Sequence, residues 1–124
     1  MVAVISFAAL TGQAADSKDG HKRVGVDEFF ELWTKEKHTV LDVRTPAEFA
    51  EGHIPGAKNI DFYAKDFAER LGKLDKSKPY LMHCRSGGRS GKAGAMMSKM
   101  GFKLVYDLAP GMNGWRKAKK PIEK

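Results

Sequence analysis

The chain has 124 residues, which suits one compact domain and leaves no room for two. Hydrophobic residues make up 42% of it and charged residues 30%, a balance typical of a folded globular protein and not of a disordered segment. The single cysteine, Cys84, excludes an internal disulfide, a CxxC redox pair and a thiolate-held zinc or iron–sulfur site within one chain. The formal net charge of +7 favours anionic partners without choosing among them.

The first 23 residues differ from the rest in composition. Met1–Gln13 carry no charge, and Val2–Leu10 form an almost unbroken apolar run followed by small residues, as in a secretory signal without its basic start. We therefore predict that residues 1–23 are a signal-peptide remnant, with a polar linker over 15–23, and that the protein works in the bacterial periplasm, or otherwise in the cytoplasm. A buried first strand and an artificial hydrophobic tail are alternative interpretations. No run is long enough for a membrane span.

From residue 24 onward, strand-like and helix-like patterns alternate, which is typical of an α/β fold. Acidic residues and helical spacing predict a first helix, and Thr45-Pro46-Ala47-Glu48 has the sequence of a capping box. The patterns predict helices over 26–33, from 45 to near 52, 63–71, 89–100 and 111–117, and strands over 39–43, 59–61, 80–83 and 103–107.

Cys84 follows a predicted strand and precedes a glycine-containing loop and a helix. Ligands bind beyond the carboxyl ends of parallel strands, so Cys84 lies where a site is expected. Gly87 and Gly88 allow successive amide N–H groups to point inward, beside the positive end of the helix that begins near Arg89. This environment should lower the pKa of the Cys84 thiol and make it a nucleophile in an anion-binding loop. Arg85 and Arg89 flank this loop and are candidates to bind an anion through their planar forks.

Other polar residues are better explained as scaffold. Asp42 and Arg44 end a strand near the site, where an ion pair between Arg44 and Glu48, or backbone amides bound by Asp42, would account for them. His83 alternates with Cys84 along a strand and should point to the opposite face of the sheet. The histidines show no spacing typical of metal ligands, so no metal site is expected.

Three segments in order resemble the single-domain rhodaneses, which are thiosulfate sulfurtransferases. Cys84–Ser90 resembles the active-site loop of that family, and Gly111–Trp115 its C-terminal segment. Its upstream signature is matched by Leu41–Arg44, Glu48-Phe49 and Gly52–Ala57. The resemblance implies a rhodanese-like domain over residues 24–124, with a central parallel sheet of about five strands flanked by helices.

The resemblance also implies a mechanism. The Cys84 thiolate attacks the outer sulfur of thiosulfate or a similar donor, and the resulting persulfide passes its sulfur to cyanide or a thiol acceptor. Cys84 is then the catalytic residue, and the substrate-binding residues are Arg85, Ser86, Gly87, Gly88, Arg89 and Ser90. No cofactor, metal, nucleic acid or membrane span is expected to take part, and we expect a monomer.

Two other classes of function share these features. A cysteine phosphatase or arsenate reductase also holds a thiolate in an anion-binding loop, but its pattern is Cys-x5-Arg, whereas Cys84 and Arg89 are separated by four residues. The loop between the cysteine and the arginine is one residue shorter here, and a tighter loop favours binding of a compact sulfur over a phosphoryl group. A persulfide carrier or binding module acting on a partner protein is the other alternative, and the intact Cys84 argues against a module without chemistry.

Overall fold

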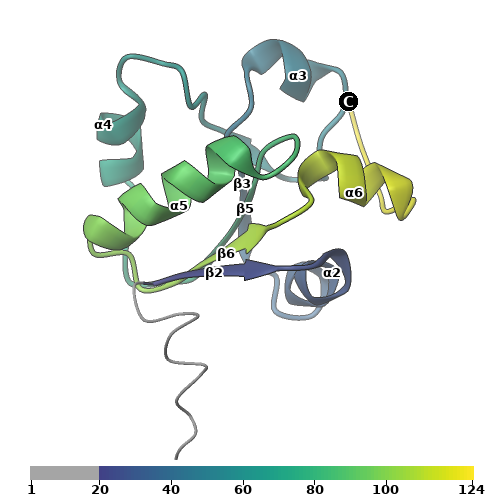
Figure 1. Ribbon diagram of the computed structural model, residues 1–124, viewed down its shortest axis with the longest axis horizontal. Coiled ribbons are helices and arrows are strands. Elements are labelled where there is room, and N and C mark those ends of the chain that lie inside the picture. The colour runs from purple at the N-terminus through teal and green to yellow at the C-terminus, as the bar shows by residue number, and fades with distance from the viewer. Residues whose placement is uncertain (1–19) are drawn as a thin grey trace, which may run out of the picture.

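The computed structural model describes residues 20–124 and confirms the predicted fold. Five parallel strands form one sheet in the order β2-β6-β5-β3-β4, with helices on both faces (Figure 1). The strands are β2 (His21–Val24), β3 (Thr39–Asp42), β4 (Lys58–Asn59), β5 (Tyr80–His83) and β6 (Val105–Leu108). The central strands β5 and β3 are buried on both sides, as their apolar sequences predict.

Five helices are described between residues 20 and 124: four connect successive strands and the fifth follows β6. Apolar side chains of the helices and the sheet form two buried clusters, one on each face of the sheet. The helices are α2 (Val26–Thr34), α3 (Pro46–Ala50), α4 (Phe67–Gly72), α5 (Gly88–Lys99) and α6 (Gly111–Lys117). Residues of α4 and α5 pack on one face, and residues of α2 and α6 on the other, around the fully buried Trp115. The short helix α3 lies beyond the carboxyl end of β3, close to the loop that joins β5 to α5 (Figure 1). None of the helices described between residues 20 and 124 is long and apolar enough to cross a membrane.

The polar linker predicted over residues 15–23 ends too late, because the first strand already begins at His21. Residues 21–23 belong to β2, which pairs in parallel with β6 and places Arg23 opposite Asp107. The polar sequence of β2 conceals the strand, because its only apolar residue is Val24, and His21 and Arg23 satisfy a buried carboxylate. The predicted signal-peptide segment over residues 1–14 lies outside the described residues and stays a prediction.

Most predicted boundaries agree with the structure to within two residues, but the helix predicted over 63–71 begins only at Phe67. Asp61 explains the difference, because its carboxylate accepts the N–H of Tyr63 and its carbonyl accepts the N–H of Ala64, so the chain turns there. The capping box at Thr45 is confirmed: Thr45 Oγ1 accepts the Glu48 N–H, and a Glu48 carboxylate oxygen accepts the Thr45 N–H.

Candidate active site

Cys84 lies directly after β5, and its sulfur is surrounded by hydrogen-bond donors from the next turn of chain. The backbone N–H groups of Gly87 and Ser90 donate to Sγ at 3.1 and 3.3 Å, and Ser90 Oγ lies 3.5 Å from it. The residue itself is only 1% exposed, whereas Arg85, Ser86 and Gly88 are exposed around it. The predicted loop therefore brings Cys84, Gly87 and Ser90 into direct contact.

The loop requires glycine at its tightest point. Gly87 has φ of +103°, in the left-handed region, and a Cβ there would clash with the carbonyl oxygen of Ala109. The beginning of α6 closes the other side, because the Met112 N–H donates to the Cys84 carbonyl at 2.9 Å and the Asn113 N–H donates to the Arg85 carbonyl at 3.0 Å. These bonds fix both ends of the peptide that follows the cysteine.

Burial and hydrogen bonding act on the Cys84 thiol in opposite directions. Burial alone raises the pKa of the Cys84 thiol, because it disfavours the charged form. The hydrogen bond between the sulfur and the Ser90 hydroxyl, and those from the N–H groups of Ser90, Gly87 and Ser86, act in the opposite direction. Together they hold the pKa of the thiol below its ordinary value. Cys84 is therefore a more acidic thiol than an unperturbed cysteine.

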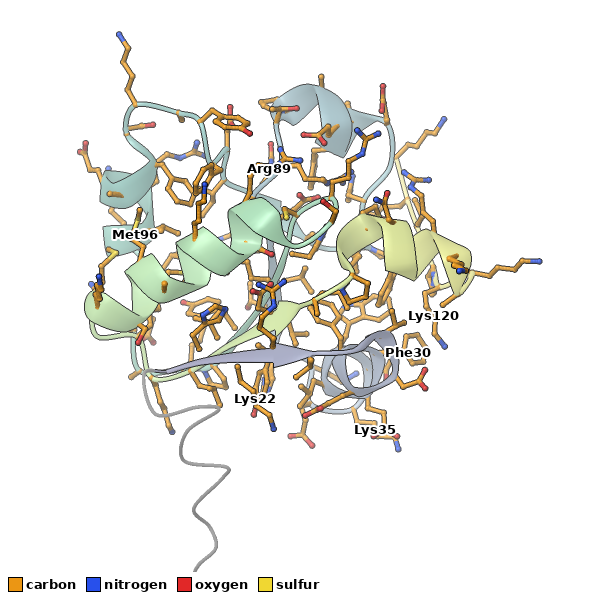
Figure 2. The ribbon with its side chains drawn as sticks, viewed as in Figure 1. Lys22, Phe30, Lys35, Arg89, Met96 and Lys120 are labelled. Carbon is orange, nitrogen blue, oxygen red and sulfur yellow. The ribbon has the colours of Figure 1, made fainter. Side chains whose placement is uncertain are left out.

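Arg89 binds a carboxylate of the protein itself. Its two terminal nitrogens donate to the two oxygens of Glu48 at 2.8 and 3.0 Å, and Figure 2 shows its side chain leaving the start of α5. The fork lowers the pKa of Glu48 to about 2, mainly through these hydrogen bonds, and raises the pKa of Arg89. The Arg89 guanidinium also lies over the ring of Tyr63, with 5.6 Å between its central carbon and the ring centroid. The anion expected beside Arg89 is thus supplied in part by Glu48.

Arg85, the residue that follows Cys84, has different surroundings from Arg89. Its side chain is exposed, and within residues 20–124 it has no salt-bridge or hydrogen-bond partner. It lines a pocket of about 340 Å³ together with Arg44, Glu51, Met112, Asn113 and Arg116. The structure therefore separates the two predicted arginines: Arg89 is held by a carboxylate, and Arg85 is available to an anion from solution.

The predicted ion pair between Arg44 and Glu48 is wrong. Arg44 does not reach Glu48, because its guanidinium binds the adjacent Asp42 at 2.7 Å and the carbonyl of Gly52. The other interpretation is confirmed, since an Asp42 oxygen accepts the Arg44 backbone N–H. His83 is fully buried next to Asp42, and its Nε2 lies 3.6 Å from the carboxylate oxygen Oδ2 of Asp42. Burial is the largest influence on its imidazole and lowers the pKa of His83.

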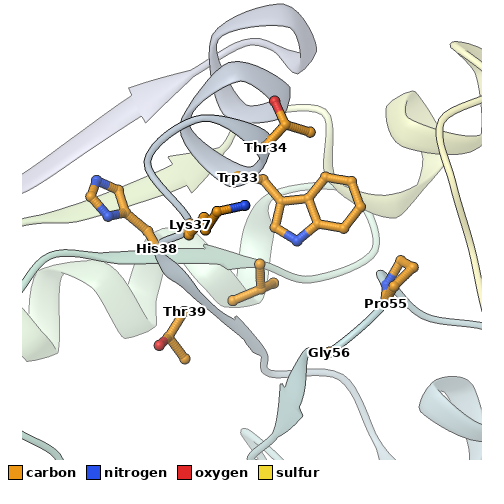
Figure 3. A pocket seen from close by; sticks show the side chains of 8 residues that line it. Trp33, Thr34, Lys37, His38, Thr39, Pro55 and Gly56 are labelled. Carbon is orange, nitrogen blue, oxygen red and sulfur yellow. The ribbon is translucent and has the colours of Figure 1, made fainter.

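Two further observations bear on ligands. A larger pocket of about 530 Å³ lies at the amino end of β3, where Trp33 and Pro55 form parts of its wall, and no predicted site residue lines it (Figure 3). Among the described residues, no group of three or more histidine, cysteine or acidic side chains is arranged to hold a metal ion.

Comparison with known proteins agrees with this geometry. The family described as the rhodanese-like domain matches residues 26–118, which is most of the chain. The chain belongs to this family. The rhodanese-like domain is 36% identical over 95 residues to the thiosulfate sulfurtransferase GlpE of Pseudomonas putida, covering 77% of this chain and 84% of that one. It is 34% identical over 83 residues to a sulfurtransferase of Allochromatium vinosum, covering 67% and 76%.

Solved structures show the same fold. The rhodanese-like domain superposes on a rhodanese-related protein of Thermoplasma volcanium with a TM-score of 0.73 and 28% identity, over 82% of this chain and 96% of that one. A rhodanese-like domain protein of Staphylococcus aureus gives a TM-score of 0.68 and 29% identity, over 76% and 90%.

Two contacts at the site were not predicted from the sequence. The capping motif identified Glu48, but nothing in it showed that Arg89, which is 41 residues away, binds the same carboxylate. Arg23, assigned to the linker, donates to the carbonyl of Gly87 inside the loop. Both contacts depend on strands that are distant in sequence lying close in the sheet, so local spacing carries no signal for them.

Proposed function

We propose that the protein transfers sulfane sulfur from thiosulfate, or a similar anionic donor, to cyanide or a thiol through a persulfide on Cys84. The Cys84 thiolate attacks the outer sulfur of thiosulfate, and the bond between the two donor sulfurs breaks. Its electron pair leaves with sulfite, so a persulfide remains on the cysteine. Attack of cyanide on the terminal sulfur then gives thiocyanate and regenerates the thiolate. No cofactor or metal is needed for either step.

The observation that carries this proposal is the set of N–H donors on Sγ. Thiol attack on sulfur requires a thiolate, and donors fixed in advance stabilise negative charge on the attacking sulfur and on the persulfide that follows. The N–H groups of Gly87 and Ser90 fulfil this role at 3.1 and 3.3 Å. A relative bearing the name thiosulfate sulfurtransferase supports the same substrate.

The remaining loop residues are proposed to bind the donor. Arg85, whose guanidinium has no partner among residues 20–124, offers it to the sulfonate oxygens. The exposed Ser86 and Gly88 bring hydroxyl and N–H donors to the same edge of the loop. Arg89 adds positive charge beside the thiolate while Glu48 fixes its orientation. A small anionic donor suits this loop, and we propose that a single chain is enough for the reaction.

The test is the mass of the intact protein. Incubation with thiosulfate should add one sulfur atom, cyanide should remove it, and thiocyanate should form catalytically. Cys84→Ser should abolish both the added mass and the turnover, because serine cannot form a persulfide. Thiocyanate formation that survives this substitution would overturn the proposal.

Phosphoryl transfer is the competing reaction, and one observation weighs against it. A phosphatase loop uses its arginine to bind phosphoryl oxygens, but the Arg89 fork is already occupied by both oxygens of Glu48. Phosphatase turnover measured on the same preparation separates the two reactions. A persulfide carrier would differ again, since it would load sulfur from thiosulfate but form thiocyanate only slowly.

The compartment is proposed from residues 1–14 alone. If this apolar segment is a signal-peptide remnant, the protein acts in the periplasm of the bacterial envelope. Adding a basic start to the segment should then export the protein and cleave it near Ala14. Complete retention in the cytoplasm would reject this part of the proposal and leave the chemistry untouched.

A further inference from the structure

Arg23, on the first strand, reaches across the sheet edge to the loop that holds Cys84. One terminal nitrogen of its guanidinium lies 3.1 Å from the carbonyl oxygen of Gly87 and 3.4 Å from that of Ala109. The same Gly87 donates its N–H to the Cys84 sulfur at 3.1 Å. Arg23 therefore binds the carbonyl of Gly87, while the N–H of the same residue binds the Cys84 sulfur.

A buried carboxylate anchors this arginine. Asp107 is 0% exposed, and one of its oxygens lies 3.5 Å from the other terminal nitrogen of Arg23 and 2.9 Å from His21 Nε2. The strands place these groups together, because β2 pairs with β6 so that Arg23 lies opposite Asp107. The guanidinium, at 43% side-chain exposure, is thus fixed at one end by a buried charge and at the other by the loop.

Helix α5 leaves room for this arrangement. A Cβ added to Gly91 would lie 2.5 Å from a terminal nitrogen of Arg23, so any larger residue at position 91 would have to displace the guanidinium. Gly94, one turn further along, similarly makes room for the ring of His21. Glycine normally weakens a helix, so two glycines on the face that meets these side chains indicate that the space serves the contact.

We propose that Arg23 is a positioning residue for the Cys84 loop, holding the Gly87 carbonyl so that the Gly87 N–H stays directed at the sulfur. The inference rests on the proposed function only in naming what the loop does. Gly87 adopts φ of +103° and, as a glycine, has other conformations open to it. The Gly87 carbonyl also accepts the Gly91 N–H at 3.0 Å and the Ser90 hydroxyl at 3.5 Å, and Arg23 adds a charge-assisted donor on the same oxygen.

The test measures the thiol and not only the turnover. Alkylation of Cys84 is followed against pH, so that the midpoint reports the pKa of the thiol and the plateau at high pH reports access to it. Arg23→Met should shift the midpoint upward, leaving roughly threefold less thiolate below the midpoint, with an unchanged plateau. Lys22→Met is the matched control: it removes the same charge from the neighbouring position, which pairs with exposed Glu28, and should leave the midpoint unchanged.

A second variant separates the contact from the charge. Gly91→Ala keeps Arg23 but displaces its guanidinium, while alanine favours the helix, so loss of folding would not explain an effect. It should raise the midpoint as Arg23→Met does, and should add nothing in the double variant. Arg23→Lys keeps the charge, but its single nitrogen cannot bind the Asp107 carboxylate and the Gly87 carbonyl as the two terminal nitrogens of Arg23 do. It should therefore restore the midpoint only in part.

The outcomes distinguish this inference from the proposed function. An alkylation midpoint that is the same in wild type, Arg23→Met and Gly91→Ala overturns the positioning role, even if sulfur transfer is confirmed. A shifted midpoint in both variants supports the role, even if the wild-type protein forms no thiocyanate. Equal shifts in Arg23→Met and Lys22→Met, abolished by salt, would show that net charge alone acts and would also overturn it.

Discussion

Arg89 and Glu48 form a two-pronged ion pair across the mouth of the site, with N–O distances of 2.8 and 3.0 Å. Arg89 belongs to the helix that follows β5, and Glu48 to the short helix that follows β3, so the pair joins the segments beyond two adjacent strands. It also fixes the orientation of the Arg89 guanidinium near Cys84. The pair is therefore part of both the fold and the proposed chemistry.

The first prediction concerns stability and pH. The pKa of Glu48 is lowered from 4.5 to about 2 in the folded protein, so its contribution to stability is fully present above pH 4.5 and is lost as pH falls through about 2. Glu48→Gln should lower the free energy of unfolding at pH 7 by about 2 kcal/mol, since glutamine still serves the capping box but not the ion pair. Urea unfolding at pH 7 and pH 3 measures this, and an equal loss at both values would contradict it.

The second prediction separates the two arginines by kinetics. Arg85→Ala should raise KM for thiosulfate by about tenfold with little change in stability, because its guanidinium is exposed and has no partner within residues 20–124. Arg89→Ala should lower both activity and stability, because it leaves Glu48 without its fork. Lys99→Ala, at the far end of α5, controls for loss of charge and should change neither. A similar modest effect from all three variants, abolished by salt, would assign the charge to long-range steering alone.

The fold and the centre of the site could be predicted because their signals are local. A short apolar strand ending at Cys84, two glycines and a helix start occupy one continuous segment, and its amide donors follow from that order. The capping box at Thr45 and Glu48 is likewise a four-residue pattern. In each case the interacting groups are separated by only a few residues, so spacing alone decides the geometry.

The contacts that escaped prediction join distant parts of the chain. Strand β2 is mostly polar because two of its side chains serve the buried Asp107, so its composition indicates a linker and its partner is 84 residues away from Arg23. Pairing of this kind is set by strand order, which local periodicity does not determine.

The third prediction tests the steric basis of the loop. Gly87→Ala should lower the free energy of unfolding by at least about 3 kcal/mol and remove activity. The added Cβ would clash with the Ala109 carbonyl oxygen, and alanine is also disfavoured in the left-handed backbone conformation of Gly87. Gly56→Ala is the matched control, because Gly56 also has positive φ, at +81°, but nothing lies within 4 Å of its added Cβ. It should lose only about 1 kcal/mol. Equal losses in the two variants would show that the contact with Ala109 is unimportant.

The fourth prediction addresses the acidity of the nucleophile through Ser90. Its hydroxyl lies 3.5 Å from the sulfur and is the strongest of the hydrogen-bond influences that lower the pKa of Cys84, while its backbone N–H is an independent donor. Ser90→Ala removes the hydroxyl and keeps the N–H, so the pKa of the Cys84 thiol should rise. Thiosulfate turnover should then fall by up to about tenfold at pH values below the alkylation midpoint and recover above it, because only the thiolate reacts. Ser98→Ala on the same helix is the control, and a loss of turnover equal at every pH would mean that Ser90 acts by packing and not through the thiol.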